Sequence, residues 1–166
     1  MPKILLFLAV ALSLCPISAA VTSEETSLKG LQGVMVSVQS LEPEVEKAGL
    51  TMHDIIRDVE LKLRIAGIPV LSEAQWLADP ARPYLAIKVN VNNRAPTDEP
   101  WPYHCGVTLM QAVTLEGNPK IHMMASTWDR DGVGSVLSGN IRHVRDGIKD
   151  YVDQFINDYL TENPKK

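Results

Sequence analysis

Sulfur and imidazole side chains form the clearest candidate for chemistry in this sequence. His104 and Cys105 are adjacent in one expected strand, and His122, Met123 and Met124 lie in the next. Thioether, thiolate and imidazole groups suit copper(I), so these residues predict a copper-type metal or small-ligand site if the two strands pair. Neighbouring residues of a regular strand point to opposite faces, however, so His104 and Cys105 cannot both bind one ion from such a strand. The alternative is that the Met and Cys side chains are buried and the His side chains lie on the surface.

Acidic and aromatic residues beside expected loops form a second candidate, for binding. Asp129 and Asp131 flank Arg130 directly after Trp128, and paired carboxylates can share acid-base chemistry or bind calcium. The stretch lacks the regular ligand series of a calcium loop, so a turn is the simpler interpretation. Trp101 lies in a proline-rich loop, where it either contacts a protein or a glycan or packs beneath its own loop. Trp101, Trp128, Asp129 and Asp131 are therefore the candidate binding residues.

No arrangement of residues predicts a catalytic site. Residues 134–139 copy the glycine spacing of a phosphate-binding loop, but Asn140 and Ile141 stand where a Lys and a hydroxyl residue are required. Neither Ser135 nor Ser138 lies in a nucleophile elbow. We therefore expect no cofactor and favour a protein that is not an enzyme.

The N-terminal residues have the three-part organisation of a secretory signal peptide. A positive charge at Lys3 precedes the apolar residues 4–14, and small residues follow at 18–20. We predict a signal peptide over residues 1–20 and a periplasmic or secreted protein. Cys15 provides the alternative, a lipoprotein anchored through this residue, although the residue before it is not the usual small one.

Charge and hydropathy restrict the partners. The chain has 166 residues and a formal net charge of −4, without a basic stripe, so nucleic acid is a poor candidate. Outside the signal no apolar run approaches the roughly 20 residues of a membrane-spanning helix, so no integral membrane segment is expected after signal removal. An envelope or extracellular protein, or a glycan, is the expected partner.

Residues 21–32 are polar and show no periodicity, which predicts a flexible leader. Hydrophobic periodicity from residue 33 onward predicts a single α+β domain over residues 33–166. Alternating apolar residues predict strands, and spacings of three and four predict helices from residue 51 and from residue 141. The strands are expected at 34–38, 68–71, 85–91, 103–115 and 121–127. The order β-α-β-β-β-β-α indicates one mostly antiparallel sheet of about five strands with two main helices on one face.

Three short features of the sequence, all of them structural and not catalytic, resemble those of other proteins. Gly49, Leu50 and Thr51 precede a helix, residues 64–68 read Arg-x-Ala-Gly-Ile, and a long helix ends the chain. In these respects the sequence resembles an uncharacterised family of small exported bacterial α+β proteins. At the level of fold it is similar to periplasmic envelope-assembly domains. The resemblance implies no catalytic residues.

Two functional hypotheses follow. The first is an exported, non-enzymatic binding or assembly module that uses a sheet edge or the Trp101 loop. The alternative is a metal or small-ligand binding protein that uses His104, Cys105, His122 and the methionines.

Overall fold

The computed structural model describes residues 24–94, 96 and 98–164. The predicted signal peptide, Cys15 with its lipoprotein alternative, and residues 21–23 of the expected leader lie outside the described residues.

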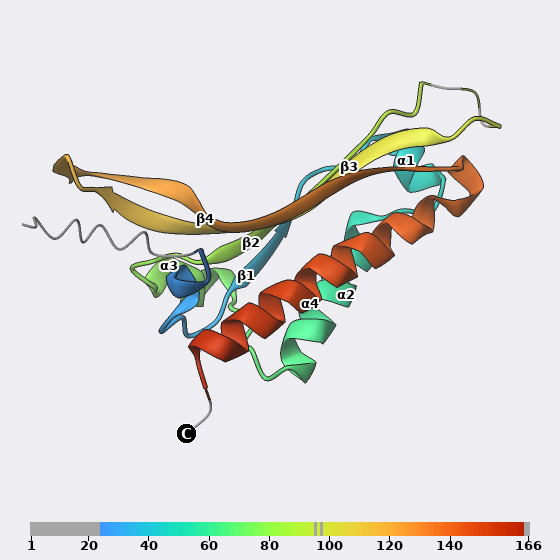
Figure 1. Cartoon of the computed structure of the whole chain (residues 1–166). Helices are drawn as coiled ribbons and strands as arrows, with labels where there is room; N and C mark the ends of the chain where they lie inside the picture. The colour runs from blue at the N-terminus through green and yellow to red at the C-terminus, as the bar shows by residue number, and fades with distance from the viewer. Residues whose placement is uncertain (1–23, 95, 97, 165–166) are drawn as a thin grey trace, which may run out of the picture.

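The strands form one sheet in the order β1-β2-β3-β4 (Figure 1). β1 pairs in parallel with β2, and the other two neighbouring pairs are antiparallel. The α+β class and the mostly antiparallel sheet are confirmed, with four strands rather than five. The strands are β1 (Met35–Val38), β2 (Tyr84–Val91), β3 (Trp101–Leu115) and β4 (Asn118–Val136).

Residues 68–71 do not form the expected second strand. Only Val70 makes an isolated bridge, to Val34. Pro69 has no N–H to donate, so this segment cannot continue a ladder of backbone hydrogen bonds. The parallel neighbour of β1 is therefore the next strand along the chain, β2.

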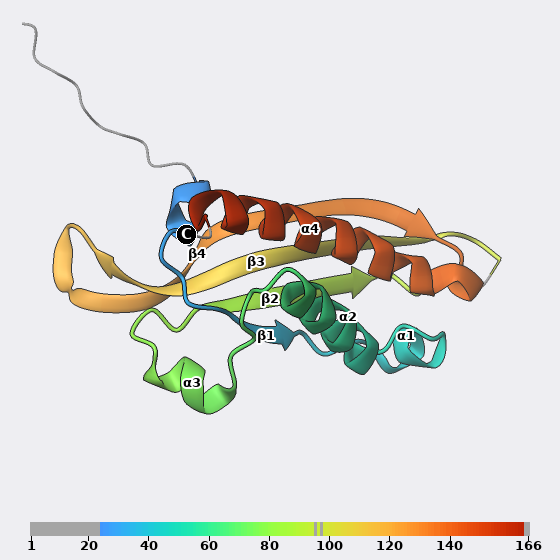
Figure 2. The same ribbon diagram turned by 90° about the horizontal axis from the view of Figure 1, so that it is seen from below.

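The two long helices lie on the same face of the sheet, as predicted (Figure 2). Thr51 caps the start of α2, because its side chain accepts a hydrogen bond from the Asp54 backbone N–H at 3.1 Å. The helices are α1 (Pro43–Lys47), α2 (Met52–Ile65), α3 (Glu73–Ala78) and α4 (Val144–Glu162), with 3-10 helices η1 (Glu24–Leu28) and η2 (Ser138–His143).

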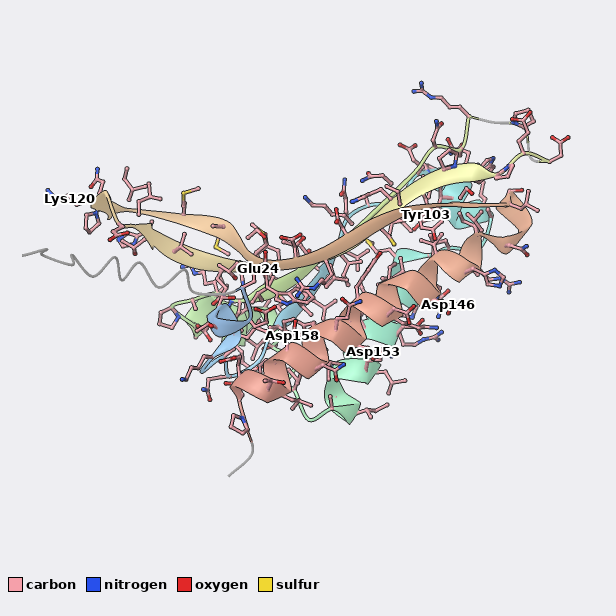
Figure 3. All side chains as sticks on the ribbon, viewed as in Figure 1. Glu24, Tyr103, Lys120, Asp146, Asp153 and Asp158 are labelled. Carbon is pink, nitrogen blue, oxygen red and sulfur yellow. The ribbon has the colours of Figure 1, made fainter. Side chains whose placement is uncertain are left out.

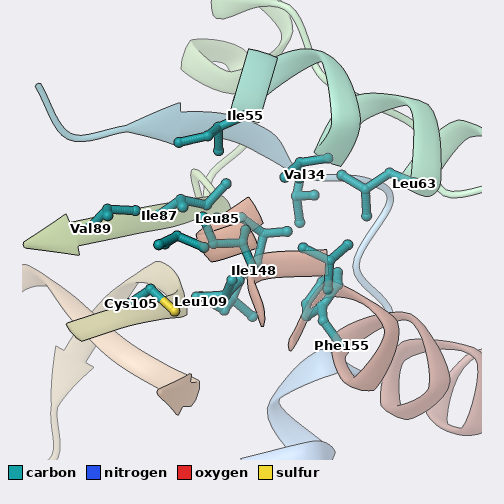
Figure 4. Close-up of a cluster of buried hydrophobic side chains, with 14 of the residues drawn as sticks. Val34, Ile55, Leu63, Leu85, Ile87, Val89, Cys105, Leu109, Ile148 and Phe155 are labelled. Carbon is teal, nitrogen blue, oxygen red and sulfur yellow. The ribbon is translucent and has the colours of Figure 1, made fainter. Parts of the chain in front are cut away.

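The hydrophobic core lies between the sheet and these two helices. Figure 4 shows side chains of β2 and β3, among them Leu85 and Leu109, in one cluster with Ile148 and Phe155 of α4. The apolar stripe predicted for the last helix is buried at every position, namely Ile141, Val144, Ile148, Val152, Phe155 and Tyr159. Its spacing of three and four therefore identified the core face correctly.

Part of the segment expected to be a flexible leader packs against the domain. Leu28 of η1 is completely buried. Further along, the Tyr159 hydroxyl donates to the Leu31 carbonyl at 2.7 Å, and the Asn163 amide donates to the Leu28 carbonyl at 2.9 Å. The packed domain therefore begins before Gly33.

β4 continues well beyond the expected strand of residues 121–127 and pairs with β3 along the whole of that strand. Its glycines make room for aromatic side chains. A Cβ at Gly132 would collide with the Tyr151 hydroxyl, and one at Gly134 would lie 2.7 Å from Tyr103. Glycines that resemble a loop in the sequence are thus strand residues here, because they permit close approach.

Candidate interaction surface

Among the described residues, no long helix covers the sheet face opposite α2 and α4, and we call this face the bare face. Figure 1 shows this face above the helices. Strand alternation places polar side chains such as Lys88 and Asn90 on it, while Ile87 and Val89 between them are buried on the other face. The bare face is therefore polar over much of its area.

Trp101 and Trp128, both predicted to bind a partner, are core side chains. Trp101 is 6% exposed and Trp128 is 0% exposed. The Trp128 indole packs edge-on against Phe155 with ring centroids 5.3 Å apart, and its N–H donates to Asp158 at 2.9 Å. The proline-rich loop before β3 consequently does not present an indole at the surface, because Trp101 begins the strand and faces the core side.

Asp129 and Asp131 lie in β4 rather than in a turn, because pairing with β3 continues through them. Both side chains are exposed, and alternation places them on the bare face. Asp131 contacts His104 with 2.9 Å between Oδ2 and Nε2. The two carboxylates are thus brought to one face of a sheet edge, as neighbours along a strand.

Arg130 points to the opposite face of β4 and meets three carboxylates there. Its guanidinium lies 2.9 Å from Glu24, 3.3 Å from Glu25 and 3.4 Å from Asp158. Figure 3 shows Glu24 and Asp158 on the helix side of β4. Three carboxylates thus surround one guanidinium on this side of β4.

The structure separates the five candidate metal ligands. Cys105 is buried in the core, whereas His104 lies on the bare face. β3 and β4 do pair, but the register places His122 opposite Thr114. Nine strand positions between Cys105 and Thr114 span about 30 Å. Among the described residues no group of three or more His, Cys, Asp or Glu side chains could hold a metal ion.

Burial also makes Cys105 unreactive. Desolvation, followed by the charge of Asp131, raises the pKa of this thiol, and the thiolate is the reactive form. We expect iodoacetamide to modify Cys105 in guanidinium chloride but not, over the same time, in the folded protein. Mass spectrometry of the peptide that contains Cys105 measures this directly, and equal modification in both conditions would contradict the burial.

β3 and β4 extend past the end of β2 as a two-stranded ribbon, residues 111–125. β2 begins at Tyr84, which pairs with Met110. Within the described part of the chain, no strand lies beside β3 beyond that point on the β2 side. Figure 3 shows Lys120 at the free end of the ribbon, far from Tyr103 at the other end of β3. Gln111 closes the core at the base of the ribbon, since its amide donates to Ser27 and Thr127.

One face of the ribbon is apolar. Val113 pairs with Met123, and Leu115 and Ile121 follow at alternate positions on the same face. The exposed fractions are 40% for Leu115, 44% for Ile121 and 48% for Met123. These side chains continue the core side of the sheet beyond the helices that cover it.

A groove of about 730 Å³ lies beside the ribbon. One wall is formed by Leu77 of α3 and Pro80 of the connection to β2, and the other by Val113 and Met123. His122 and Met124 line it as well. The residue types of Met123 and His122 predicted metal ligands, and the apolar surface itself was not predicted, although its signal is present in the sequence as apolar residues at 113, 115, 121 and 123.

Comparison with known proteins shows little similarity. No family model and no curated protein matches the chain, which agrees with the predicted resemblance to an uncharacterised family. The crystal structure of rare lipoprotein B from Shewanella oneidensis is similar over 78% of this chain and 91% of that chain, with a TM-score of 0.28 and 15% identity. In residues 24–164, apart from 95 and 97, no helix is both long and apolar enough to cross a membrane.

Proposed function

We propose that this protein is an exported, non-enzymatic binding or assembly module that contacts an envelope or extracellular protein through the apolar face of its ribbon. The observation that carries the proposal is the exposure of Leu115, Ile121 and Met123 beyond the cover of the helices. Contiguous exposed apolar side chains mark interaction sites more often than isolated ones do. Such a face favours a protein partner over a glycan.

The proposed location, periplasmic or secreted, rests on the signal-like residues 1–20. Acylation at Cys15 is the alternative form, in which the same module would be tethered to a membrane. The binding surface is the same in both forms, because the ribbon lies within the folded domain.

Replacing Ile121 and Met123 together with Ser is expected to reduce recovery of the partner in an affinity pulldown by at least about tenfold. Central apolar contacts commonly contribute more than about 1 kcal/mol each, and 1.4 kcal/mol is a factor of ten in affinity. The melting temperature should stay close to that of the wild type, because both side chains are about half exposed and lie outside the buried core.

The matched control replaces Leu61 and Ile65 of α2 with Ser, since these side chains are 56% and 77% exposed but lie away from the ribbon. Equal loss of partner in both double variants would show that general surface hydropathy, and not the ribbon, is responsible. Elemental analysis of the same eluate tests the metal alternative. Stoichiometric copper with no reproducible partner would overturn the proposal.

A further inference from the structure

The backbone hydrogen bonds on the β2 side of β3 determine which residues of β4 point their N–H and C=O groups out of the sheet. The Pro102 carbonyl accepts from Asn92 at 2.9 Å, and the Ala112 N–H donates to Ala81 at 2.7 Å. The backbone N–H and C=O groups of the even-numbered residues of β3 therefore point away from β4. Those of the odd-numbered residues form hydrogen bonds with β4. In an antiparallel ladder the N–H and C=O of one residue point the same way.

The register then assigns the outward residues of β4. The odd residues of β3 from 101 to 109 pair with even residues 128–136 of β4, so residues 129, 131, 133 and 135 direct their backbone groups away from the sheet. Two bonds agree with this direction. The Thr127 carbonyl accepts from the Ser27 hydroxyl at 3.0 Å, and the Asp129 carbonyl accepts from Arg130 at 2.6 Å. Beyond Asp129, no strand of the described residues lies beside this edge.

The outward residues carry a specific pattern of side chains on the bare face. Asp129 and Asp131 are exposed acids. Val133, two positions further, is 85% exposed, more than any other large apolar side chain among the described residues. A shallow hollow of about 700 Å³ adjoins Val133 and is lined also by Tyr103 and His104. Along the edge, two acidic side chains, Asp129 and Asp131, are thus followed by the apolar side chain of Val133.

The charge of this edge indicates which kind of strand would pair with it. Asp129 and Asp131 make the bare face of this edge acidic, and on the other face of β4 Glu24 and Asp158 lie 2.9 and 3.4 Å from Arg130. A second copy of β4 paired with Asp129 opposite Asp131 would set carboxylate against carboxylate, and like charges across a strand pair are destabilising. A strand with Lys or Arg at alternate positions would gain favourable charge pairs as well as backbone hydrogen bonds.

We propose that residues 129–135 of β4 bind an extended segment of a partner protein as an added strand. Lys or Arg lies opposite Asp129 and Asp131, and an apolar residue lies opposite Val133. An antiparallel segment then reads apolar-x-cation-x-cation. This inference rests on the proposed binding function and names one class of segment that the module recognises.

A synthetic fluorescent peptide, Thr-Val-Thr-Lys-Thr-Lys-Thr, tests the proposal against the purified protein by fluorescence anisotropy. We expect saturable binding that weakens as salt is raised, because the charge pairs are exposed. A peptide with Glu in place of both Lys should not bind. A peptide of the same composition with adjacent lysines should bind about fivefold more weakly, because only one Lys can then face the acidic row.

Charge reversal at the edge gives the first pair of variants. Asp129→Lys with Asp131→Lys should weaken binding of the Lys peptide about tenfold or more and permit binding of the Glu peptide. Glu44→Lys with Glu46→Lys makes the same change in net charge on exposed positions of α1, and should leave binding within about twofold. Equal loss in the two double variants would overturn the proposal, since it would indicate attraction by net charge alone.

A second pair of variants tests whether the outward backbone N–H groups of β4 form hydrogen bonds with the peptide. Val133→Pro removes one outward N–H without removing a bond to β3, because proline is tolerated at such an edge position. Val133→Thr keeps that N–H and serves as its control. The Pro variant should bind about fivefold more weakly than the Thr variant, and equal affinities would exclude strand addition. A dimer of the Thr variant that dissociates in the Pro variant would assign the edge to a second copy and overturn the proposal.

The ribbon variant separates this inference from the proposed function. Ile121→Ser with Met123→Ser should still bind the Lys peptide with wild-type affinity. Ribbon-dependent recovery of a partner, together with no peptide binding, would overturn the edge inference alone. Peptide binding without any ribbon-dependent partner would instead overturn the ribbon as the contact surface.

Discussion

Replacing Trp128 with Ala is expected to lower the free energy of unfolding by about 3–5 kcal/mol. The side chain is completely buried, packs against Phe155 and donates its indole N–H to Asp158. The Arg130 guanidinium lies 4.8 Å from the ring centroid. The variant would lose this packing and leave a cavity at the junction of β4 with α4. Small domains have a total stability of about 5–15 kcal/mol, so it should unfold at much lower urea.

Urea denaturation followed by circular dichroism measures the effect of Trp128→Ala. Trp76→Ala is the control, because that indole is only half-buried and packs against Tyr84 at the sheet periphery. This variant should lower the free energy of unfolding clearly less than Trp128→Ala does. A Trp128→Ala variant with unchanged stability and lost partner recovery would contradict the core assignment and restore a binding role for this residue.

Replacing Arg145 with Ala is expected to cost about 1.5–3 kcal/mol of stability, the range for hydrogen bonds to charged groups. Arg145 of α4 donates to Asp58 of α2 with 2.9 Å between Nε and Oδ2, and Lys149 lies 3.5 Å from the same carboxylate. The Arg145 and Asp58 side chains are only 19% and 17% exposed. Removing Arg145 leaves a poorly hydrated carboxylate between the helices.

The same pair predicts a pH dependence. Burial is the largest influence on the pKa of Asp58 and opposes its ionisation, but the hydrogen bonds and charges of Arg145 and Lys149 together outweigh it. The pKa of Asp58 is therefore lowered from its usual 3.8. A lowered folded pKa stabilises the protein above the unfolded value, and this stabilisation is lost as the pH falls through the folded pKa. The wild type should lose stability below about pH 4 more steeply than Arg145→Ala does.

Urea denaturation across this pH range tests the prediction, and parallel curves for the two proteins would contradict it. Arg57→Ala is the matched control on α2. Its ion pair with Asp54 has 63% of the Arg side chain exposed, and exposed pairs contribute only about 0–1 kcal/mol.

The sequence predicted those elements whose signals lie within their own residues. Thr51 and Asp54 are three positions apart, so their capping contact needs nothing beyond the first turn of α2. The spacing of Ile148, Val152 and Phe155 identifies the core face of α4 in the same way, because one helix turn repeats every 3.6 residues. Alternation in β2 likewise separated buried from exposed positions.

Features that depend on distant residues were predicted wrongly. Gly132 and Gly134 resemble a loop until Tyr151 and Tyr103 are known to occupy the space beside them. Pairing of β3 with β4 was expected, but it did not bring His122 near His104, because a strand pair is defined only when its register is known.

The sequence alone determined which side chains share a face, since helix and strand periods are properties of the backbone. Tertiary structure decided which of those faces are covered. Trp128 and Val133 lie in the same strand, yet α4 buries the first and nothing described covers the second, whose side chain points to the bare face. Ile121 and Met123 are exposed because β2 begins opposite Met110 and the helices end near the base of the ribbon. Whether a face is covered depends on the relative lengths and packing of separate helices and strands. A pattern within one element therefore cannot predict it.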